Sequence, residues 1–412
     1  MCIGFFIRWL VFLMLSQAAL ANPLEERFEL SSRIKAMGGI GIAQADDFSA
    51  TYYNPANLGF CPTTIISLGY QHTGTKFKSS KGRNKDPEQL GSNHVMLLGA
   101  CLKLPFNIAL GAYGSFGIGP VALKFRTADG QLRMPLYDHS LTPPSAGFAL
   151  SIRPIKWLAL GIGTSITIHT QLQQKIVLPL PPAQEALEID MSGSVSPTVP
   201  IVAGITLEPL DGLRIAAVVR SARYNKFEDV SLAHLKVLGN EIEVKQFLEG
   251  SFGFSPMQIG GGISYSFLDF TVGGDLTWYR WSAYGGPFLK IKSADNTKLG
   301  GFINYPPNEE YKFTDILIPR IGAEYVWNNT ISARAGYGYR TSPAPEPVGV
   351  AQLIDGSVHM LSCGGGYKHA WEKVALLADA YFGAQIMPKR VFKNYNLAGW
   401  AYNTGLSLSV AY

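Results

Sequence analysis

The spacing of the turns is the feature that most limits how this chain can fold. Strand-like runs are joined alternately by connections of about two to six residues and by polar stretches several times longer. A soluble β-sandwich has no reason to place every long loop at one end. A bacterial outer-membrane barrel does so, because its strands are joined by short periplasmic turns and longer external loops. This alternation of short and long connections therefore predicts an all-β fold, a transmembrane antiparallel β-barrel.

About fourteen runs can be counted, an even number, as single-chain bacterial barrels have. A weak run at 230–248 leaves a range of twelve to sixteen strands open. The short joints lie at 105–107, 153–157, 208–212, 268–269, 327–329 and 368–373, and the long polar stretches include 71–93, 171–199 and 280–319. The runs begin near Ile65, His94, Ile108, Ala146, Leu158, Pro200, Leu213, Met257, Phe270, Arg320, Thr330, His359, Ala375 and Leu406.

Within the runs, apolar and polar side chains alternate. From 331 to 339 the odd positions are apolar, and Arg334 lies on the opposite face. Glu324 and Asp379 likewise oppose the apolar sides of their runs, and Asp275 opposes Leu276. Because side chains of a strand alternate with a period of two, this pattern predicts an apolar face toward lipid and a polar face toward the lumen.

Composition fits a single large barrel. The chain has 412 residues, of which 47% are hydrophobic and only 16% are charged. Beyond the first 21 residues, no segment approaches the roughly 20 consecutive apolar residues that a spanning helix needs. A chain of this kind can cross a membrane only with closed strands, because open sheet edges cannot be hydrogen-bonded in lipid.

The first 21 residues read as a secretory signal peptide. Arg8 supplies the positive charge, 9–15 the apolar core, and Ala19 with Ala21 an A-x-A cleavage site. The alternative is an uncleaved anchor at 3–20, which Arg8 interrupts. Removal of the signal would also remove Cys2 and leave Cys61, Cys101 and Cys363, which are widely spaced. They form neither a disulfide framework nor a C-x-x-C metal site, so we expect them to pack as small apolar residues.

The sequence carries no pattern of an enzyme. It lacks a G-x-S-x-G elbow, an H-E-x-x-H motif and a phosphate loop, and its seven histidines show no metal-ligand spacing. We therefore predict no catalytic activity, cofactor or metal, although a Ser/His pair on adjacent strands stays open as a barrel-surface lipase. The net charge of +5 is dispersed, which argues against a nucleic-acid partner.

Residues 22–60 do not alternate like strands. One helical turn ends at Gly38 and Gly39, a second turn follows at 46–50, and Asn54 and Pro55 fix a third turn at 54–56. Phe48, Tyr52 and Tyr53 in this stretch need burial, and the lumen of a wide barrel can provide it. We expect a plug inside the barrel rather than a loose periplasmic extension.

Three ordered blocks resemble one family. The stretch from Arg33 through Gly39, Asp46 and Asp47 to Tyr53-Asn54-Pro55-Ala56 is similar to the N-terminal hatch of the long-chain fatty acid transporter family (FadL/TodX type). Segments 334–345 with 353–367, and 275–282, resemble two further blocks of that family. Two positions depart from the pattern, Asn57 in place of a usual Gly and Ser357 in place of a second charged residue.

The resemblance implies a signal peptide at 1–21, a hatch at 22–60 and a fourteen-stranded barrel at 61–412. It implies a monomeric channel in the bacterial outer membrane, surrounded by outer-membrane lipid and lipopolysaccharide. The C-terminal strand, which ends at Tyr412, resembles the signal for the barrel-assembly machinery. Hydrophobic molecules would be captured by external loops and released sideways into the membrane past the hatch, with a gating role for Gly38, Gly39, Asn54, Pro55 and Ala56.

A fatty-acid cargo would require a cation for its carboxylate, because a buried anion needs a partner. Lys175 and Lys312 are candidates, each with the alternative of a solvated loop charge, and Arg334 is a third. Arg334 has its own alternative, an ion pair with a wall acid such as Glu324, Asp275 or Asp379. Aromatic hydrocarbons are the alternative cargo, and a secretion-system scaffold is the alternative to transport. A general diffusion porin ranks third because it should lack a hatch.

Overall fold

The computed structural model describes residues 30–81, 84–85, 89–118, 125–126, 132–135, 144–167, 172–180, 185–193, 195–197, 199–237, 240–285, 290–294, 312–345, 353–392 and 395–412. The predicted signal peptide and the first residues of the hatch therefore lie outside the described residues. In the described part of the chain, no helix is both long enough and apolar enough to span a membrane.

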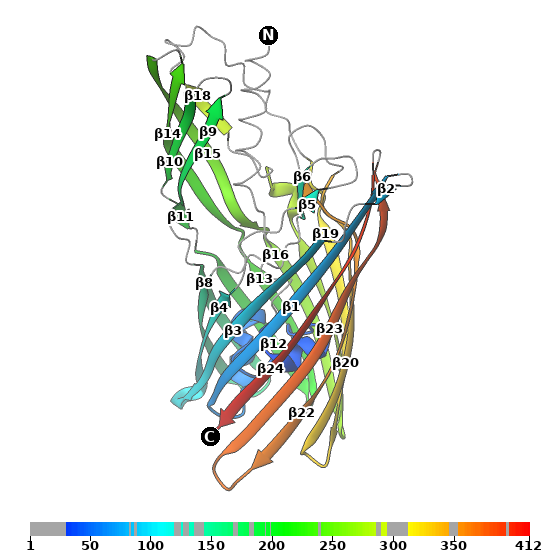
Figure 1. The fold of residues 1–412 in the computed structure, drawn as a ribbon. Coiled ribbons are helices and arrows are strands. Elements are labelled where there is room, and N and C mark those ends of the chain that lie inside the picture. The colour runs from blue at the N-terminus through cyan, green and yellow to red at the C-terminus, as the bar shows by residue number, and fades with distance from the viewer. Residues whose placement is uncertain are drawn as a thin grey trace.

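Fourteen antiparallel strands of the described chain form a closed barrel, as predicted (Figure 1). The barrel closes because β1 pairs with β24 on one side and with β3 on the other, so that Ile65 faces both Ala411 and Cys101. The two-residue strand β2 (Asn84–Lys85) only prolongs the pairing at the end of β1. The strands are β1 (Ile65–Lys81), β3 (Gln89–Leu104), β4 (Ile108–Ile118), β7 (Ser145–Ile155), β8 (Leu158–Thr167), β12 (Ile201–Leu210), β13 (Leu213–Arg220), β16 (Gln258–Phe267), β17 (Phe270–Tyr279), β19 (Ile316–Trp327), β20 (Ile331–Arg340), β22 (Val358–Ala370), β23 (Ala375–Val391) and β24 (Asn396–Ala411).

The outer surface of the barrel is apolar and its inner face is polar. In β19, Ile321 is 61% exposed whereas Glu324 is 4% exposed, and in β20 Ile331 is exposed while Arg334 is buried. The pattern repeats around the sheet, because consecutive side chains of a strand point to opposite faces. An exposed apolar wall would be unfavourable in water and matches the hydrocarbon of a bilayer.

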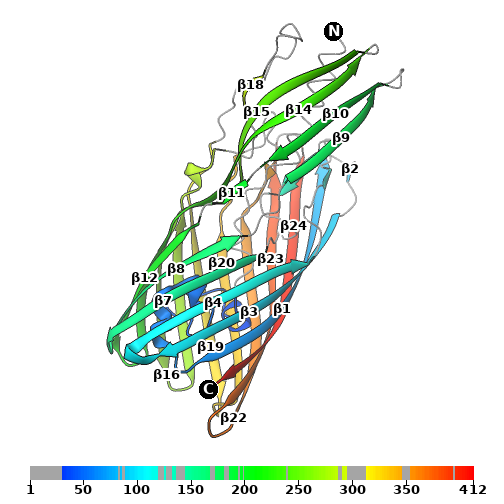
Figure 2. The same cartoon turned by 90° about the vertical axis from the view of Figure 1, so that its left-hand side faces the viewer.

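The two ends of the barrel differ (Figure 2). One end carries the short joints, including the 3-10 turn η3 (Pro105–Asn107), together with the C-terminus. Exposed aromatic side chains cluster at this end, namely Trp157, Trp327, Trp371 and Tyr412. This is the position of an interfacial aromatic girdle.

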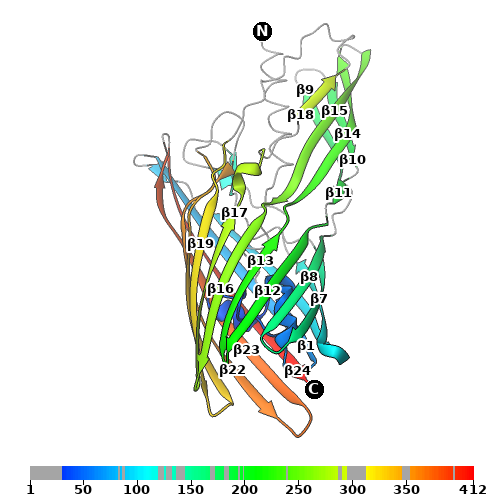
Figure 3. The same ribbon diagram turned by 180° about the vertical axis from the view of Figure 1, so that it is seen from behind.

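The long polar stretches at the other end contain more strand than the sequence suggested. Most of 71–93 extends β1 and β3 and is not a loop. The run at 230–248 falls in a hairpin outside the closed sheet, so it does not change the strand count. That hairpin belongs to a separate six-stranded sheet that projects beyond the barrel (Figure 3), formed by β9 (Leu172–Leu180), β10 (Glu185–Gly193), β11 (Val195–Pro197), β14 (Arg223–Val237), β15 (Asn240–Ser255) and β18 (Lys290–Ala294). Three short strands pair apart from both sheets, β5 (Phe125–Arg126), β6 (Leu132–Pro135) and β21 (Leu353–Ile354).

Residues 30–60, called the hatch from here on, lie inside the barrel (Figure 1). They form α2 (Ser32–Ala36), α3 (Ala50–Tyr53) and the 3-10 helix η2 (Pro55–Phe60). Helix α2 contacts β20, β22, β23 and β24, whereas η2 contacts β4, β7, β8 and β12, which are on the opposite side of the ring. The hatch therefore crosses the bore from wall to wall.

The membrane-facing surface can be tested at Ile321, in the middle of β19. Ile321→Arg should lower the free energy of unfolding by roughly 2–4 kcal/mol, because a lipid-facing guanidinium must leave water. Asp211→Arg, in the exposed turn between β12 and β13, is the matched control and should change stability little. Refolding into lipid bilayers under urea measures both variants. Equal stability of the two would contradict the assignment of the outer face.

Candidate functional site

The contact between the hatch and the wall contains a chain of ion pairs. Arg33 of α2 binds Glu324 of β19 in a bidentate manner, with Nε–Oε1 and Nη2–Oε2 distances of 3.1 and 2.8 Å. Glu324 also accepts from Nε of Arg334 at 2.7 Å, and Arg334 Nη1 donates to Asp379 of β23 at 2.6 Å. Glu324 and Arg334 are buried, and they lie directly opposite each other in the pairing of β19 with β20. Glu324 thus joins a hatch cation to a wall cation.

Small residues on the wall let the hatch backbone approach this network. A Cβ added to Gly336 would lie 2.1 Å from the amide nitrogen of Gly38, so no larger residue fits there without displacement. Gly38 and Gly39 have φ values of 74° and 80°, the left-handed region that glycine adopts without strain. The amide of Gly38 donates to Ser362 Oγ at 2.9 Å, and that hydroxyl in turn donates to the carbonyl of Ala36 at 3.1 Å. The two predicted glycines therefore seat the end of α2 on β20 and β22.

Asn54 organises the second half of the hatch. Its side chain is buried, donates to the carbonyl of Ile42 at 2.9 Å and to Thr206 Oγ1 at 3.0 Å, and accepts from the amide of Ala56 at 3.1 Å. The last bond caps η2, whose first residue is Pro55, a residue that suits a helix start. The predicted turn at 54–56 is therefore held by both the hatch and the wall.

Asn57, which departs from the family pattern, completes this network. Its side chain is fully buried, donates to the carbonyl of Ile42 at 3.0 Å and accepts from Thr206 Oγ1 at 2.6 Å. Thr206 of β12 is thus shared by two hatch asparagines. A glycine at 57 would leave the Thr206 hydroxyl without this acceptor, so the departure strengthens the attachment of the hatch.

A cavity of about 40 Å³ lies between the hatch and the wall strands β13, β16, β17 and β19. Arg220 and Arg320 line it together with Asp275 and Tyr52, and all but Tyr52 are buried. The Arg220 guanidinium stacks on the Tyr52 ring at 4.5 Å and donates to the Tyr52 carbonyl, while Asp275 accepts from the amide of Ile42 at 3.0 Å. This volume holds about one water molecule, so a hydrophobic molecule could enter only if the hatch or the wall moved.

A cluster of aromatic and aliphatic side chains packs where the barrel strands meet the long-loop end. Trp281, in the 3-10 turn η4 (Trp281–Ala283), is 1% exposed and lies 6.1 Å from the Phe313 ring. Its other members are Phe254, Tyr279, Tyr284, Ile316, Ile318 and Ala344. The cluster is a buried, uncharged core at the long-loop end of the barrel.

The three candidate ligand cations lie in different places. The backbone of Lys175 is in β9, opposite Asp190 of β10, which places it in the separate sheet, and its side chain lies outside the described residues. Lys312 is exposed directly before Phe313. Arg334 is held by Glu324 and Asp379, so the ion pairs predicted for it are confirmed. The sequence analysis did not identify Arg220 and Arg320 as cavity residues. Each follows or precedes an apolar, outward-facing residue of its strand, and this alternation could have indicated that both arginines point into the barrel.

Comparisons with known proteins agree with this architecture. A scan of protein families gave no match. The chain is 24% identical over 333 residues to alkane uptake protein A of Marinobacter nauticus, which covers 72% of this chain and 68% of that protein. It resembles the crystal structure of a FadL homologue of Pseudomonas aeruginosa, with a TM-score of 0.59, 14% identity and coverage of 92% and 97% of the two chains.

The toluene transporter TodX of P. putida has a TM-score of 0.56 to this chain, with 15% identity and coverage of 94% and 99%. The chain has the FadL/TodX fold. The resemblance predicted from the ordered motifs is therefore confirmed at the level of the fold.

If the ion pairs of Glu324 hold α2 against the wall, removing this carboxylate should make α2 open more often. Glu324→Gln should remove the carboxylate that Arg33 and Arg334 share and leave each with one acidic partner, Asp46 and Asp379. The cost should therefore stay below the about 3–5 kcal/mol of a fully broken buried pair. Amide hydrogen exchange in α2 should then become about 10- to 100-fold faster.

Asp315→Asn is the matched control for this experiment. Asp315 is exposed directly before β19 and accepts from the Ser282 amide at 2.8 Å, away from the hatch. Exchange in α2 should be unchanged in this variant. Equal exchange rates in Glu324→Gln and the wild type would show that the ion pairs do not hold the hatch.

Proposed function

We propose that this protein is a passive uptake channel of the bacterial outer membrane for hydrophobic molecules. The observation that carries the proposal is a closed barrel with an apolar exterior whose bore is crossed by a segment seated on the inner wall. A general diffusion porin needs an open aqueous bore, so the hatch argues against that alternative. The related alkane uptake protein and the similar toluene channel support hydrophobic cargo.

The route we propose enters at the long-loop end and leaves sideways. An apolar molecule gains nothing from crossing a watery pore, whereas a lateral exit returns it to hydrocarbon. The aromatic cluster around Trp281 would receive the molecule, and the hatch would then move to open the cavity at Arg220 and Tyr52. Gly38, Gly39, Asn54, Pro55 and Ala56 would serve as gating residues because they fix the hatch to the wall.

The division into a signal peptide (1–21), a hatch (22–60) and a barrel (61–412) belongs to this proposal, as does a monomeric state. Outer-membrane lipid and lipopolysaccharide would contact the apolar exterior. The barrel-assembly machinery would recognise the last strand, which alternates up to its end, with Leu406, Leu408 and Val410 exposed, and finishes at Tyr412.

Long-chain fatty acids and neutral hydrocarbons are both candidate cargoes. A fatty acid would place its carboxylate beside a cation, for which we propose Lys175 and Lys312 near the entrance, with Arg220 and Arg320 deeper in the bore. Because two acids of the wall, Glu324 and Asp379, already bind Arg334, we propose that it anchors the hatch through Glu324 and does not bind ligand directly. A scaffold for a secretion system is the non-transport alternative.

Removal of the hatch turn should separate transport from folding. Asn54→Ala with Pro55→Ala removes the cap of η2 and the bond from Asn54 to Thr206, so this part of the hatch is held less firmly against β12. We expect a heat-modifiable barrel in the outer membrane with reduced uptake of labelled oleate or hexadecane. Pro105→Ala with Asn107→Gly changes the same residue types in an exposed turn, where the φ of 56° at Asn107 suits glycine, and should leave uptake intact. Unchanged uptake in the inserted hatch variant would remove the gating role.

Binding experiments with variants of Lys175 and Lys312 can decide whether the cargo is a fatty acid or a neutral hydrocarbon. If a lysine holds a carboxylate, its replacement by Ala should weaken oleate binding by about 1.5–3 kcal/mol, roughly 10- to 150-fold in Kd, and leave toluene and hexadecane binding unchanged. Titration of wild type, Lys175→Ala and Lys312→Ala with all three ligands provides the measurement. Undiminished oleate binding in both variants would refute the assignment, and failure to bind any ligand would favour the scaffold.

A further inference from the structure

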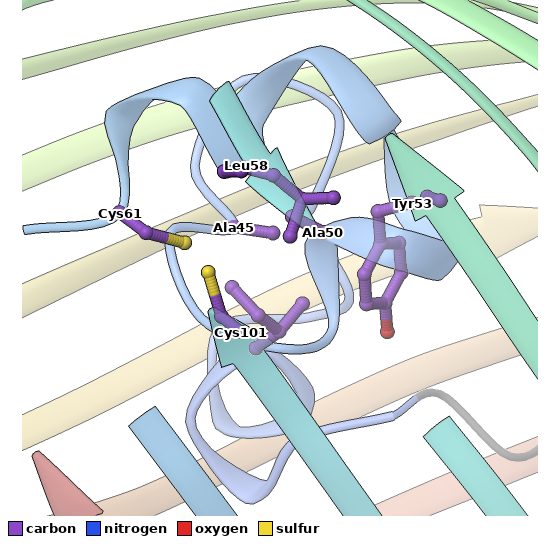
Figure 4. Close-up of a cluster of buried hydrophobic side chains, with 9 residues drawn as sticks. Ala45, Ala50, Tyr53, Leu58, Cys61 and Cys101 are labelled. Carbon is purple, nitrogen blue, oxygen red and sulfur yellow. The ribbon is translucent and has the colours of Figure 1, made fainter. Parts of the chain in front are cut away.

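Cys61 and Cys101 meet at the end of the hatch. Cys61 directly follows η2, and Cys101 lies on the inward face of β3. Both side chains are buried, at 1% and 0% exposure, within an apolar cluster that includes Ala45 and Leu58. Figure 4 shows their sulfur atoms facing each other across the boundary between hatch and wall. The prediction that the three cysteines pack as small apolar residues holds for Cys61 and Cys101, whereas Cys363 is exposed, and the sequence did not indicate that the two buried cysteines lie side by side.

We propose that Cys61 and Cys101 form a disulfide bond that fixes the hatch to the barrel wall. Both thiols are free in the structure, but their sulfur atoms face each other and share a hydrogen bond at a site enclosed by protein, so a short approach of the two side chains would allow a bond to form. The third cysteine of the described chain, Cys363, is exposed on the outer face of β22 and has no comparable neighbour among the described residues.

The bond would form by ordinary thiol–disulfide exchange. The thiolate of one cysteine attacks the disulfide of a protein oxidant, and the second thiolate then displaces it from the mixed disulfide. One sulfur–sulfur bond forms, two thiol protons are released, and the two electrons reduce the oxidant to a dithiol. The step rests on the proposed outer-membrane location, because a chain bound for that membrane crosses the periplasm, where disulfides form and persist.

The packed structure indicates when oxidation takes place. The hydrogen bond to Cys101, followed by burial, raises the pKa of the Cys61 thiol well above its ordinary value. Thiolate, the reacting form, is therefore scarce once the hatch is seated. Exchange must occur during folding, before Leu58 and Ala45 enclose the pair, and the same enclosure then protects the bond from reductants.

A bond at this position would limit how the hatch can move. Cys101 pairs with Ile65, the first residue of β1, so the cross-link would tie the segment just before β1, which is the C-terminal end of the hatch, to the neighbouring strand β3. Asn54 and α2 lie on the N-terminal side of the bond, which places no covalent constraint on them. Opening would then be a displacement of α2 from β20 and β22 and not an expulsion of the whole hatch.

Site-resolved alkylation tests the bond directly. The protein is extracted from outer membranes into denaturant with a maleimide, digested, then reduced and treated with a second, mass-distinct maleimide. Cys61 and Cys101 should carry only the second label, while Cys363 carries the first. A peptide linking Cys61 to Cys101 should appear without reduction and disappear after it.

Two serine variants make the result specific. In Cys101→Ser, Cys61 should take the first label as fully as Cys363 does, and Cys61→Ser should expose Cys101 in the same way. First-label reaction of both cysteines in the wild type, to the extent seen at Cys363, would overturn the proposal whether or not the variants fold. If both cysteines of the wild type react with the first label and the protein still takes up cargo, the disulfide proposal is wrong but the proposed function stands. If the linked peptide is found but no uptake occurs, only the proposed function fails.

Discussion

A spanning sheet in lipid must satisfy every backbone hydrogen bond within itself, and the rest of this structure depends on that constraint. The pairing of β1 with both β24 and β3 removes the sheet edges. Closure of fourteen strands encloses a bore that wall side chains alone do not fill. The hatch fills it, and so the inner wall must accept a folded segment. Glycines such as Gly336, and polar groups such as Thr206 and Glu324, stand where that segment touches the wall.

The hatch is attached to the wall by ion pairs at α2, by the bonds of Asn54 and Asn57 to Thr206, and by an apolar cluster that Ile34 of α2 shares with Leu58. Arg33 holds α2 through ion pairs that pass to Arg334 and Asp379, whereas Leu58 and Cys61 pack in an apolar cluster against Cys101. Buried ion pairs contribute less to net stability than to a defined geometry, because desolvation offsets much of their attraction. Apolar packing contributes stability but is lost when water enters. The ion pairs therefore define the position of the hatch, and the apolar cluster contributes more of the stability that keeps it there.

The sequence predicted much of the fold and less of the site, for a physical reason. Period-two alternation is local, so the strands and the lumen-facing acids, including the partners of Arg334, could be identified in advance. The pairing of Arg33 with Glu324 joins residues 291 positions apart, and no local pattern carries that information. The same holds for Cys61 with Cys101 and for Arg220 with Tyr52, since only closure of the barrel around the hatch brings these side chains together.

The uneven attachment of the hatch determines which half can open at low cost. Separating Leu58 and Cys61 from Cys101 would expose apolar surface to water, and a disulfide would forbid it. Displacing α2 would expose Ile34 as well, but it breaks no covalent bond, and Glu324 keeps Arg334 when Arg33 leaves. The wall therefore stays electrostatically balanced while the hatch moves. Opening should begin at α2, next to β20 and β22, and the lateral route should be sought along the strands that α2 uncovers.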